Sequence, residues 1–377
     1  MNNKKTIAAL LAAASLTFGT TAFADGTFDG EAVSEGLNSF ATTVNTAVPD
    51  AATMQNVWSN AFIGTIYPGL KFGFGASLGG TLIDFSGFKS AADALTGGMV
   101  SEMTPTIAGY EIQGFKLPDK FLLPTASVDL RIGGLILPFD IGISGMVTAP
   151  SFKNIDYSDP ATLAESISNS WEWNLSNFNG SVSYTAIGLD LRYCLYEGSL
   201  IVPKISLGGG YYYINGSFAV NRNEAGEYEG YKYNSEAALG LSYNTNVYFA
   251  NLQLSKNFGV VEVFLGGRAL YARSASDWSW KYEVTSEDGS TVYSTDSDSG
   301  SVSKGEGKIY TTNEDGTVTV DVNAIQPQLY LGLGGNFGIF SVSFNVCADL
   351  GTIQAAAAAN DASQFIWSGG LNIHVTL

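Results

Sequence analysis

The sequence is poor in charge, cysteine and histidine, and each shortage excludes a class of protein. Charged residues make up 14% of the 377 positions, against about 25% in an ordinary soluble domain. Two cysteines and one histidine provide no metal-ligand spacing and little material for acid–base catalysis. The chain also lacks the run of about 18 apolar residues that a transmembrane helix requires.

Glycine and aromatic residues are abundant instead, with 44 Gly, 22 Phe and 19 Tyr. The last thirteen residues show how they are used: every odd position from Phe365 to Leu377 is apolar or glycine, whereas Asn372, His374 and Thr376 are polar. Period-two alternation predicts a strand with one apolar and one polar face. Its length exceeds the ~5–6 residues of a typical soluble strand and matches the ~9–11 that a bilayer-spanning strand needs.

Residues 1–24 are predicted to be a signal peptide for export through the Sec route. Lys4 and Lys5 give the positive start, Ile7–Leu16 is mostly apolar, and Ala22-Phe23-Ala24 is a cleavage site. No cysteine follows the apolar core, so we expect no lipoprotein anchor. Loss of the two lysines would leave 16 basic and 35 acidic residues, a net charge of −19. This charge argues against a nucleic-acid partner and favours an acidic exposed surface.

Residues 25–68 are predicted to form a separate, partly helical segment. Asp50, after Pro49, can cap a helix. Its apolar face would carry Ala51, Met54, Val57, Trp58, Ala61 and Phe62. Two interpretations stay open, a periplasmic segment that packs under the barrel and a plug inserted in its lumen.

Residues 69–377 contain repeated alternating stretches that predict an all-β fold, a transmembrane antiparallel up-and-down β-barrel. Short reversals are expected near 137–138, 197–199, 257–259 and 336–338. Long outer loops are expected at 86–122, 151–179, 221–230, 284–305 and 352–363. Since outer-membrane barrels have short periplasmic turns and long outer loops, this pattern predicts ten strands with both termini periplasmic. The count becomes twelve if Thr106–Phe115 and a break near Tyr243–Asn246 each add a strand.

Several connections carry finer signals. A short helix is possible at Ala91–Leu95, and the Ala-rich Ala355–Ala359 is expected to be a loop. Glu287-Asp288-Gly289 and Glu314-Asp315-Gly316 suggest hairpin tips. Several strands exceed the bilayer, so the sheet is expected to extend beyond the lipid. Trp171 and Trp173 fit either an interfacial girdle or an ordinary loop cluster.

The inward positions carry a balanced set of charges and the single histidine. A lysine or arginine facing hydrocarbon at the midplane costs ~2–4 kcal/mol, so the face bearing these residues must be the interior. The predicted lumen-lining residues are Lys71, Asp129, Arg131, Asp140, Asp190, Arg192, Lys204, Glu262, Arg268, Asp349 and His374. They form either ion pairs that brace a narrow barrel or the wall of a polar conduit.

Catalysis and metal binding have little support in the residues. Any Ser-His or Asp-His machinery would need His374, which is predicted to be a wall residue near the periplasmic end. Asp296-x-Asp298-x-Gly300 has part of the spacing of a calcium loop without its remaining ligands. Cys194 and Cys347 are predicted to be two separate thiols. We therefore predict no enzyme, no cofactor and no metal.

The chain resembles bacterial outer-membrane β-barrel proteins. The resemblance rests on the signal ending Ala22-Phe23-Ala24, the alternating strands, and the terminal run Leu371–Leu377, which is similar to the C-terminal assembly signal of that class. It departs in ending with Leu377 where Phe or Trp is usual. The helical segment before the first strand is similar to that of plugged long-chain fatty-acid transporters, which have fourteen strands. No residue of theirs is carried over.

Two functions follow as expectations for a protein of the outer membrane of a diderm bacterium. The first is a narrow, porin-like channel or transporter for small solutes, motivated by the polar lumen. The alternative is a structural or surface-interaction barrel with a filled lumen, motivated by the low strand count and the acidic outer stretch at 277–321. The expected partners are outer-membrane lipid and, as the resemblance implies, the barrel-insertion machinery during assembly; small solutes are a further candidate.

Overall fold

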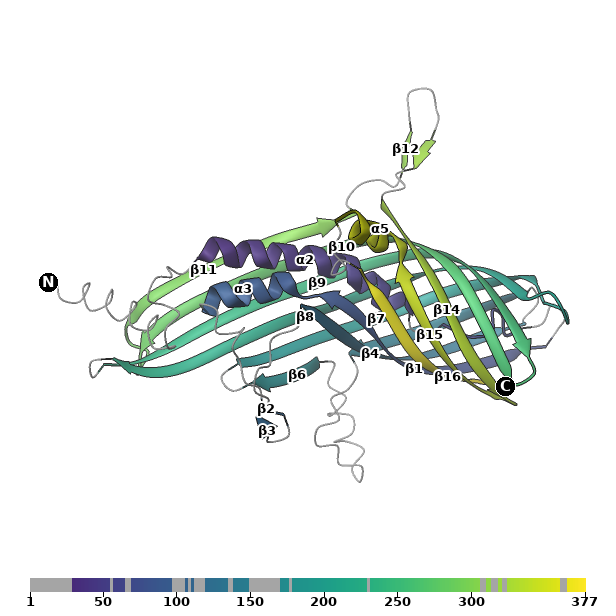
Figure 1. The fold of residues 1–377 in the computed structure, drawn as a ribbon, viewed down its shortest axis with the longest axis horizontal. Coiled ribbons are helices and arrows are strands. Elements are labelled where there is room, and N and C mark those ends of the chain that lie inside the picture. The colour runs from purple at the N-terminus through teal and green to yellow at the C-terminus, as the bar shows by residue number, and fades with distance from the viewer. Residues whose placement is uncertain are drawn as a thin grey trace.

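Ten antiparallel strands pair in sequence order and close into a ring (Figure 1). The computed structural model describes residues 29–54, 57–64, 69–96, 106–107, 110–111, 119–134, 138–148, 170–175, 178–228, 231–305, 310–312, 318–320, 324–359 and 365–377. The ring consists of β1 (Lys71–Asp84), β4 (Lys120–Gly133), β5 (Phe139–Thr148), β7 (Phe178–Tyr196), β8 (Lys204–Tyr228), β9 (Tyr231–Phe258), β10 (Val261–Ser286), β14 (Ile325–Phe337), β15 (Phe340–Asp349) and β16 (Trp367–Thr376). Pairing of β16 with β1, from Gly73↔Thr376 to Thr81↔Ser368, closes it. The predicted all-β barrel of ten strands is confirmed.

Apolar side chains cover the outside of the ring. Large exposed examples from successive strands are Phe74, Val128, Ile143, Ile187, Leu207, Leu252, Leu265, Leu331, Phe344 and Ile373. Successive side chains of a strand point to opposite faces, so β10 alternates between exposed and buried positions over most of its length. The outer face is therefore a continuous apolar belt suited to lipid.

Aromatic rings mark both ends of this belt. At one end, Tyr211, Tyr248 and Tyr271 are register partners on three adjacent strands, with ring centroids 5.1 and 6.3 Å apart. At the other end the exposed aromatic residues include Phe72, Tyr193, Phe258, Phe337 and Phe340. The ten residue steps from Val261 to Tyr271 rise about 25 Å, at about 3.3 Å per residue and about 40° of tilt. This is the height of an outer-membrane apolar band.

Tight turns gather at one end of the ring, which we call the short-turn end; the opposite end is the outer end. Gly259 and Gly338 have φ values of 81° and 69°, a left-handed conformation that favours glycine. The turns predicted at 257–259 and 336–338 are therefore confirmed. Leu377 lies at the short-turn end, where its backbone exchanges hydrogen bonds of 2.8 and 3.0 Å with Phe72.

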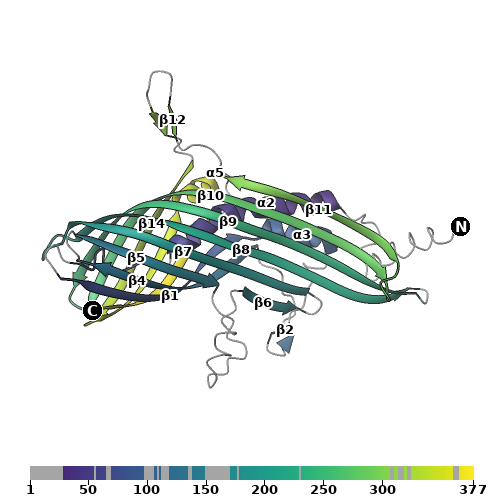
Figure 2. The same cartoon turned by 180° about the vertical axis from the view of Figure 1, so that it is seen from behind.

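The sheet continues far beyond the tyrosine row at the outer end, as expected from strand length. β8, β9 and β10 have 25, 28 and 26 residues. Past Tyr271, the partner of β10 changes from β14 to β11 (Val292–Lys304), and β6 (Ser170–Leu175) pairs with the outer part of β7. The strands from β6 to β11 without closure form what we call the outer sheet (Figure 2).

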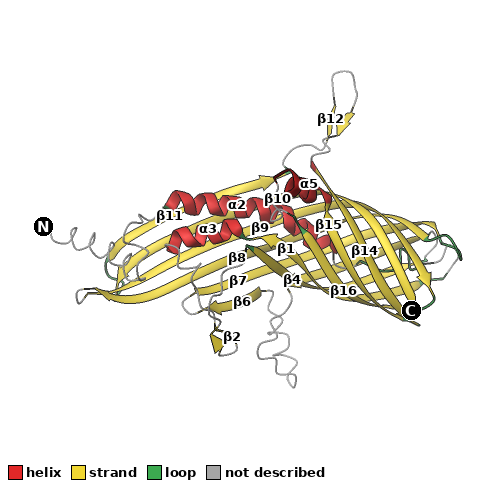
Figure 3. Ribbon diagram, viewed as in Figure 1, coloured by secondary structure: helices red, strands yellow, loops and turns green. Residues whose placement is uncertain are grey.

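Two helices, α2 (Gly30–Met54) and α3 (Ser86–Thr96), pack on the lumen-side face of the outer sheet (Figure 3). Asp29 caps α2 by accepting a 3.0 Å hydrogen bond from the Ala32 N–H. Phe40 of α2 lies against Phe88 of α3 and Phe218 of β8, with both centroid distances 5.1 Å. Because the outer sheet does not close into a ring, none of the described strands lies opposite to cover its apolar lumen-side face, and the two helices bury that face instead.

Pro49 lies inside α2 and removes one hydrogen bond of the helix. A proline has no N–H, so the carbonyl of Asn45 loses its usual intrahelical donor. The Ser274 hydroxyl of β10 donates to that carbonyl over 3.3 Å. The Asn45 side chain donates to the Val302 carbonyl at 3.0 Å and accepts from Ser276 at 2.6 Å. The outer sheet thus supplies the partners that let the helix continue through its proline.

α2, which lies within the segment 25–68 predicted to be either periplasmic or a plug, runs along the outer sheet and into the ring. Near its start, the Ser34 hydroxyl donates to Asp298 of β11 over 2.7 Å, at the outer end (Figure 1). Near its end, the Thr53 carbonyl accepts from Arg268 inside the ring. The helix therefore enters the ring from the outer end and runs toward the short-turn end, since its apolar face can be buried only between the outer sheet and the lumen.

Several predicted loops are regular structure. The stretch 86–122 contains α3, longer than the helix predicted at 91–95, and a small hairpin of β2 (Thr106–Ile107) and β3 (Tyr110–Glu111), which stays outside the ring. Most of 221–230 and 284–305 is strand. The outer sheet faces water, so its exposed residues are polar although their backbones stay hydrogen-bonded to the neighbouring strands. The expected Ala-rich loop is α5 (Leu350–Ala359), capped by Asp349. β9 has no break at 243–246.

The remaining local predictions divide in three. The hairpin tip at Asp288-Gly289 is confirmed between β10 and β11, and the two cysteines are free and buried. The tip at 314–316 lies outside the described residues, although β12 (Tyr310–Thr312) and β13 (Val318–Val320) pair on either side of it. The helix predicted from Asp50 to Phe62 is wrong, since α2 begins earlier and ends at Met54.

Residues 1–28 and 151–169 lie outside the described part of the chain, so the signal peptide stays a prediction. Trp171 and Trp173 fall on β6, opposite Val182 and Gly180, on the outer side of the tyrosine row. No helix among the described residues has the length and apolarity to cross a membrane.

Candidate functional site: the filled lumen

Residues 57–64, which we call the inner segment, cross the interior of the ring below α2. Val57, Trp58, Ser59, Ala61, Phe62 and Ile63 are all at most 3% exposed. The segment lacks regular secondary structure, so its backbone groups need partners from outside. The wall of the ring supplies them, which makes this contact the candidate functional site.

Four wall side chains bind the backbone of the inner segment. Gln253 donates to the Trp58 carbonyl over 2.7 Å, and Ser255 accepts from the Ala61 N–H at 3.0 Å. Arg192 donates to the Asn60 carbonyl at 3.1 Å and Lys204 to the Phe62 carbonyl at 2.8 Å. These residues come from β7, β8 and β9, so one side of the wall holds the segment along its length.

Trp58 is the largest side chain that the inner segment places in the lumen. Its indole N–H donates to Asp129 over 2.8 Å, and its ring stacks on His374 with centroids 4.0 Å apart and planes 20° apart. The guanidinium of Arg131 lies 5.7 Å from the indole centroid. A Cβ on Gly73 would come within 2.4 Å of the Trp58 ring, so only glycine leaves room for the indole there.

Asp140 is the centre of a buried ion-pair network. It is fully buried and accepts from Arg131 at 2.7 Å and from Arg192 at 2.7 and 2.6 Å. It also accepts from the Ile63 N–H at 3.1 Å. Arg131 binds Asp190 through a second pair of contacts at 2.6 and 2.7 Å. Buried charges are tolerated when paired and hydrogen-bonded in this way, and the inner segment completes the set.

The remaining predicted lumen residues divide between the inner segment, α2 and the wall. Glu262 accepts from Ser59 at 2.8 Å and from Asn336 at 3.1 Å. Arg268 donates to the Thr53 carbonyl at 2.6 Å and lies 4.8 Å from the Tyr330 ring centroid. Lys71 is half-buried at the short-turn end of β1.

Two predicted lumen residues have surroundings that the sequence did not indicate. Asp349 is buried but caps α5, accepting from the Gly351 N–H at 2.7 Å and from Gln326 at 3.2 Å. His374 is 1% exposed, and its Nε2 lies 3.9 Å from Asp129. Its ring is covered by Trp58 and is a packed wall element in this arrangement.

The described residues leave two spaces along the lumen: an open recess of about 290 Å³ at the short-turn end, beside Asn60, Lys204 and Glu262, and a smaller cavity deeper in the ring. A cavity of about 30 Å³ remains between the end of α2, the inner segment and the wall, room for about two water molecules. Its lining includes Trp58, Arg131, Arg268 and Tyr212. A solute larger than water therefore has no place within this part of the ring.

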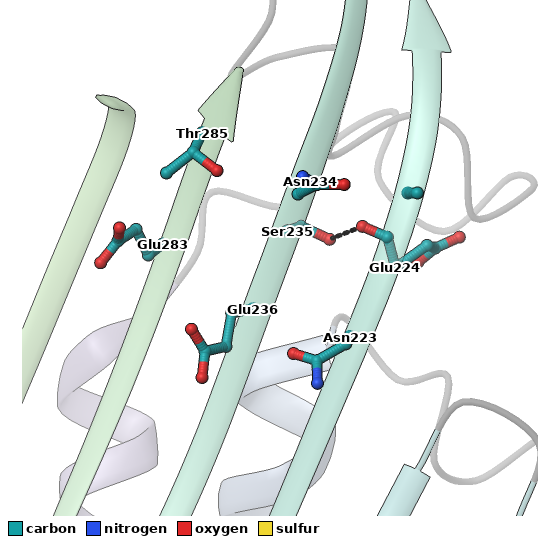
Figure 4. A pocket seen from close by; sticks show the side chains of 8 residues that line it. Asn223, Glu224, Asn234, Ser235, Glu236, Glu283 and Thr285 are labelled. Atoms are coloured by element: carbon teal, nitrogen blue, oxygen red, sulfur yellow. Dashed lines mark hydrogen bonds between the residues drawn. The ribbon is translucent and has the colours of Figure 1, made fainter. Parts of the chain in front are cut away.

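The tip of the outer sheet carries an open acidic recess of about 400 Å³ (Figure 4). Glu236 of β9 lies directly across the ladder from Glu283 of β10, and Lys281 pairs with Glu283 at 2.5 Å. The Ser235 hydroxyl donates to the Glu224 carbonyl over 3.4 Å. Among the residues that the structure describes, no group of three or more His, Cys, Asp or Glu side chains is arranged to hold a metal ion.

Four side chains bind the main chain of the inner segment: Arg192 and Lys204 are among the predicted lumen-lining residues, whereas Gln253 and Ser255 are not. Asn60, whose side-chain oxygen accepts from Lys204 and whose carbonyl accepts from Arg192, is also absent from the predicted site. An available signal was the cluster Val57–Ile63, with its buried-type apolar residues in a stretch too short and irregular for a barrel strand. The charged residues of the predicted set follow from strand alternation, which fixes the face that each residue occupies.

Comparison with known proteins gives architecture only. No protein-family model matches the chain, and no curated protein matches it. The translocator domain of the autotransporter NalP from Neisseria meningitidis matches at TM-score 0.34 and 10% identity, covering 90% of this chain and 99% of that chain. The outer membrane protease OmpT from Escherichia coli matches at TM-score 0.37 and 11% identity, covering 82% and 96%. A FadL homologue from Pseudomonas aeruginosa matches at 0.27 and 8%, covering 85% and 96%.

The class of the protein follows from its own geometry. A closed antiparallel ring, an apolar outer belt about 25 Å high with aromatic ends, and a buried polar interior are the features of a transmembrane β-barrel of the bacterial outer membrane. Whether such a barrel transports, catalyses or anchors depends on its site and not on its fold.

Proposed function

We propose that the protein is a closed outer-membrane anchor, which holds the outer sheet, α2 and α3 at the cell surface for interaction with a partner. In this proposal the inner segment is a plug. The observation that carries it is the lumen, where the inner segment is bonded to opposite parts of the wall and leaves a cavity of only about 30 Å³ between itself, the end of α2 and the wall. A ten-stranded ring is close to the eight-stranded size at which side chains fill the interior.

The energetics of the network support a permanently occupied lumen. Withdrawal of the inner segment would remove the Ile63 donor from Asp140, the Trp58 donor from Asp129 and the Ser59 donor from Glu262. Each loss of a hydrogen bond to a buried charged group costs about 1.5–3 kcal/mol unless water replaces it. Opening is therefore unfavourable unless water enters along the whole segment.

The height of the outer sheet supports a role at the surface. β9 runs seventeen residues from Tyr248 back to Tyr231, about 40 Å beyond the tyrosine row at the same tilt. A strand of this length is unnecessary for crossing a membrane. The extension buries an apolar core between sheet and helices, so it is a folded platform whose outward face and acidic recess are accessible.

Conductance of the purified protein in planar bilayers tests the proposal. The wild type is expected to give no steady single-channel steps. A variant with Trp58→Gly and Phe62→Gly, which empties part of the lumen, is expected to leak and shows that the assay detects an open ring. Migration as a folded, heat-modifiable band confirms that both proteins are intact. Steady conductance of the wild type would overturn the anchor.

A gated passage for small solutes is the second candidate, and it fits the balanced wall charges. If the inner segment left, Arg131, Arg192 and Lys204 would line a polar path together with Asp140 and Glu262. Swelling of protein-containing liposomes in small sugars separates the candidates. Swelling by the wild type without steady bilayer steps would favour gating, and its absence would favour the anchor.

A further inference from the structure

A row of polar side chains crosses the outward face immediately beyond the tyrosine row. Tyr213 of β8, Asn246 of β9 and Arg273 of β10 are register partners, two residues outward from Tyr211, Tyr248 and Tyr271. We call them the headgroup row. The tyrosine row ends the apolar belt, so the headgroup row lies at the level of the lipid headgroups.

Arg273 is the cation of this row, and its guanidinium has donors to spare. Its Nε donates to the Tyr271 hydroxyl over 3.0 Å, and the guanidinium lies 5.6 Å from that ring's centroid. Tyr271 is itself fixed, since its hydroxyl donates to the Gly305 carbonyl at 3.1 Å. Within the described residues, Arg273 is exposed and forms no ion pair with a carboxylate. Both terminal nitrogens are thus left for an external acceptor.

The neighbours of Arg273 in the headgroup row, Asn246 and Tyr213, also keep hydrogen-bond donors for an external acceptor. The Tyr211 hydroxyl donates to the Asn246 side-chain oxygen over 2.6 Å, which leaves the Asn246 amide nitrogen as a donor beside the guanidinium. Asn244 donates to the Tyr213 hydroxyl at 2.6 Å, so that hydroxyl keeps its proton for another acceptor. Donors from three strands therefore lie together on a surface that continues the lipid-facing belt.

We propose that the headgroup row binds the phosphate of an anionic lipid in the leaflet at the outer end. A planar guanidinium beside amide and hydroxyl donors matches phosphate oxygens, and Arg–phosphate pairs are commonly bidentate. The exposed Tyr248 of the tyrosine row would lie against the upper acyl chains while the headgroup row holds the headgroup. The nearest outward acid on the same strand is Asp277, four residues on, which leaves the phosphate level without a like charge from β10.

Retention of anionic lipid by the intact protein tests the proposal. Wild-type protein would be extracted from bilayers of phosphatidylcholine with a minor fraction of phosphatidylglycerol, and bound lipid counted by native mass spectrometry. Arg273→Gln is expected to lower bound phosphatidylglycerol about fivefold, from the effect of about one surface cation. Arg273→Lys keeps the positive charge but loses the bidentate guanidinium, so its bound phosphatidylglycerol is expected to lie between that of the wild type and that of Arg273→Gln.

Lys281→Gln is the matched control, because Lys281 is an exposed base on the same strand, eight residues further out. It is expected to retain lipid like the wild type. Equal retention by Arg273→Gln and wild type would overturn the site, and an equal loss in Lys281→Gln would show general surface charge instead. Inorganic phosphate in excess distinguishes the two phosphate sources. If it binds at Arg273 while lipid retention is the same in all variants, the lipid assignment is wrong.

Discussion

Replacement of Asp140 by asparagine should destabilise the barrel more than any exposed charge change. The carboxylate is fully buried and accepts four hydrogen bonds, from Arg131, twice from Arg192, and from Ile63. Asparagine keeps the shape but leaves two buried guanidinium groups with one fewer negative charge. Breaking a buried pair from one side costs about 3–5 kcal/mol, and we expect that loss in the free energy of unfolding.

The assay is urea unfolding of the folded protein in detergent, followed by tryptophan fluorescence. Glu287→Gln is the matched control, because Glu287 pairs with Lys232 at 3.3 Å with both side chains more than half exposed, and an exposed pair contributes about 0–1 kcal/mol. The double variant Asp140→Asn with Arg192→Gln should lose less than the sum of its single changes. A loss below about 1 kcal/mol for Asp140→Asn would refute the view that this network holds the inner segment.

Three further predictions concern the outer sheet, its helices and its tip. The outer end of the barrel should face the cell exterior. Ser39→Cys, on the exposed face of α2, should then react with an impermeant maleimide on intact cells, whereas Asn257→Cys at the short-turn end should react only after the outer membrane is opened. The reverse order of reaction would show that the barrel has the opposite orientation. Gly36→Ala should lower the free energy of unfolding by about 1–3 kcal/mol, because the added Cβ would lie 2.7 Å from the Ala91 nitrogen. Gly145→Ala is the control: its Cβ would have nothing within 4 Å, so the free energy of unfolding should change by less than about 0.5 kcal/mol. Similar losses in the two variants would show that α2 and α3 do not pack at Gly36. Ser286→Ala should raise the pKa of Asp288, which hydrogen bonds from Ser286 and Ser290 hold at about 2, toward 3.8. A depressed carboxyl pKa contributes stability above the ordinary pKa that is lost as pH falls through the folded value, so the wild-type tip should keep its order to lower pH than the variant in carboxyl NMR titrations; an unchanged pKa would contradict the assigned cause.

The barrel could be predicted from sequence because its two signals are local. Alternation identifies the strand faces, and short Asn-Phe-Gly turns such as 257–259 set the hairpin order. Both signals identify strands correctly wherever one face of the sheet contacts lipid, because that face must be apolar. The outer sheet breaks this condition, since residues such as Asn223 and Glu236 face water. Polar residues there looked like loops although the ladder continues.

The candidate site could be predicted only in part, because its charges are local and its partners are not. The inward positions of Asp140 and Arg192 follow from strand alternation. Their hydrogen bonds to the backbone of the inner segment, however, join residues more than 70 positions apart in the sequence. The acceptors are mostly main-chain carbonyls, which any residue could supply. The course of α2 was missed for a similar reason: the partner that lets it pass Pro49 is Ser274, on a strand more than 220 residues away.

A disulfide between the inner segment and the wall tests the central claim most directly. Ala61 and Ser255 are joined by a 3.0 Å hydrogen bond, so their cysteine pair should bridge in outer membranes when Cys194 and Cys347 are replaced by serine. Ala61→Cys with Leu254→Cys, whose side chain lies on the opposite face of β9, is the control. The account predicts a redox-sensitive shift in gel mobility for the first pair alone. Absence of that bridge, or equal bridging in the control, would contradict a lumen filled by residues 57–64.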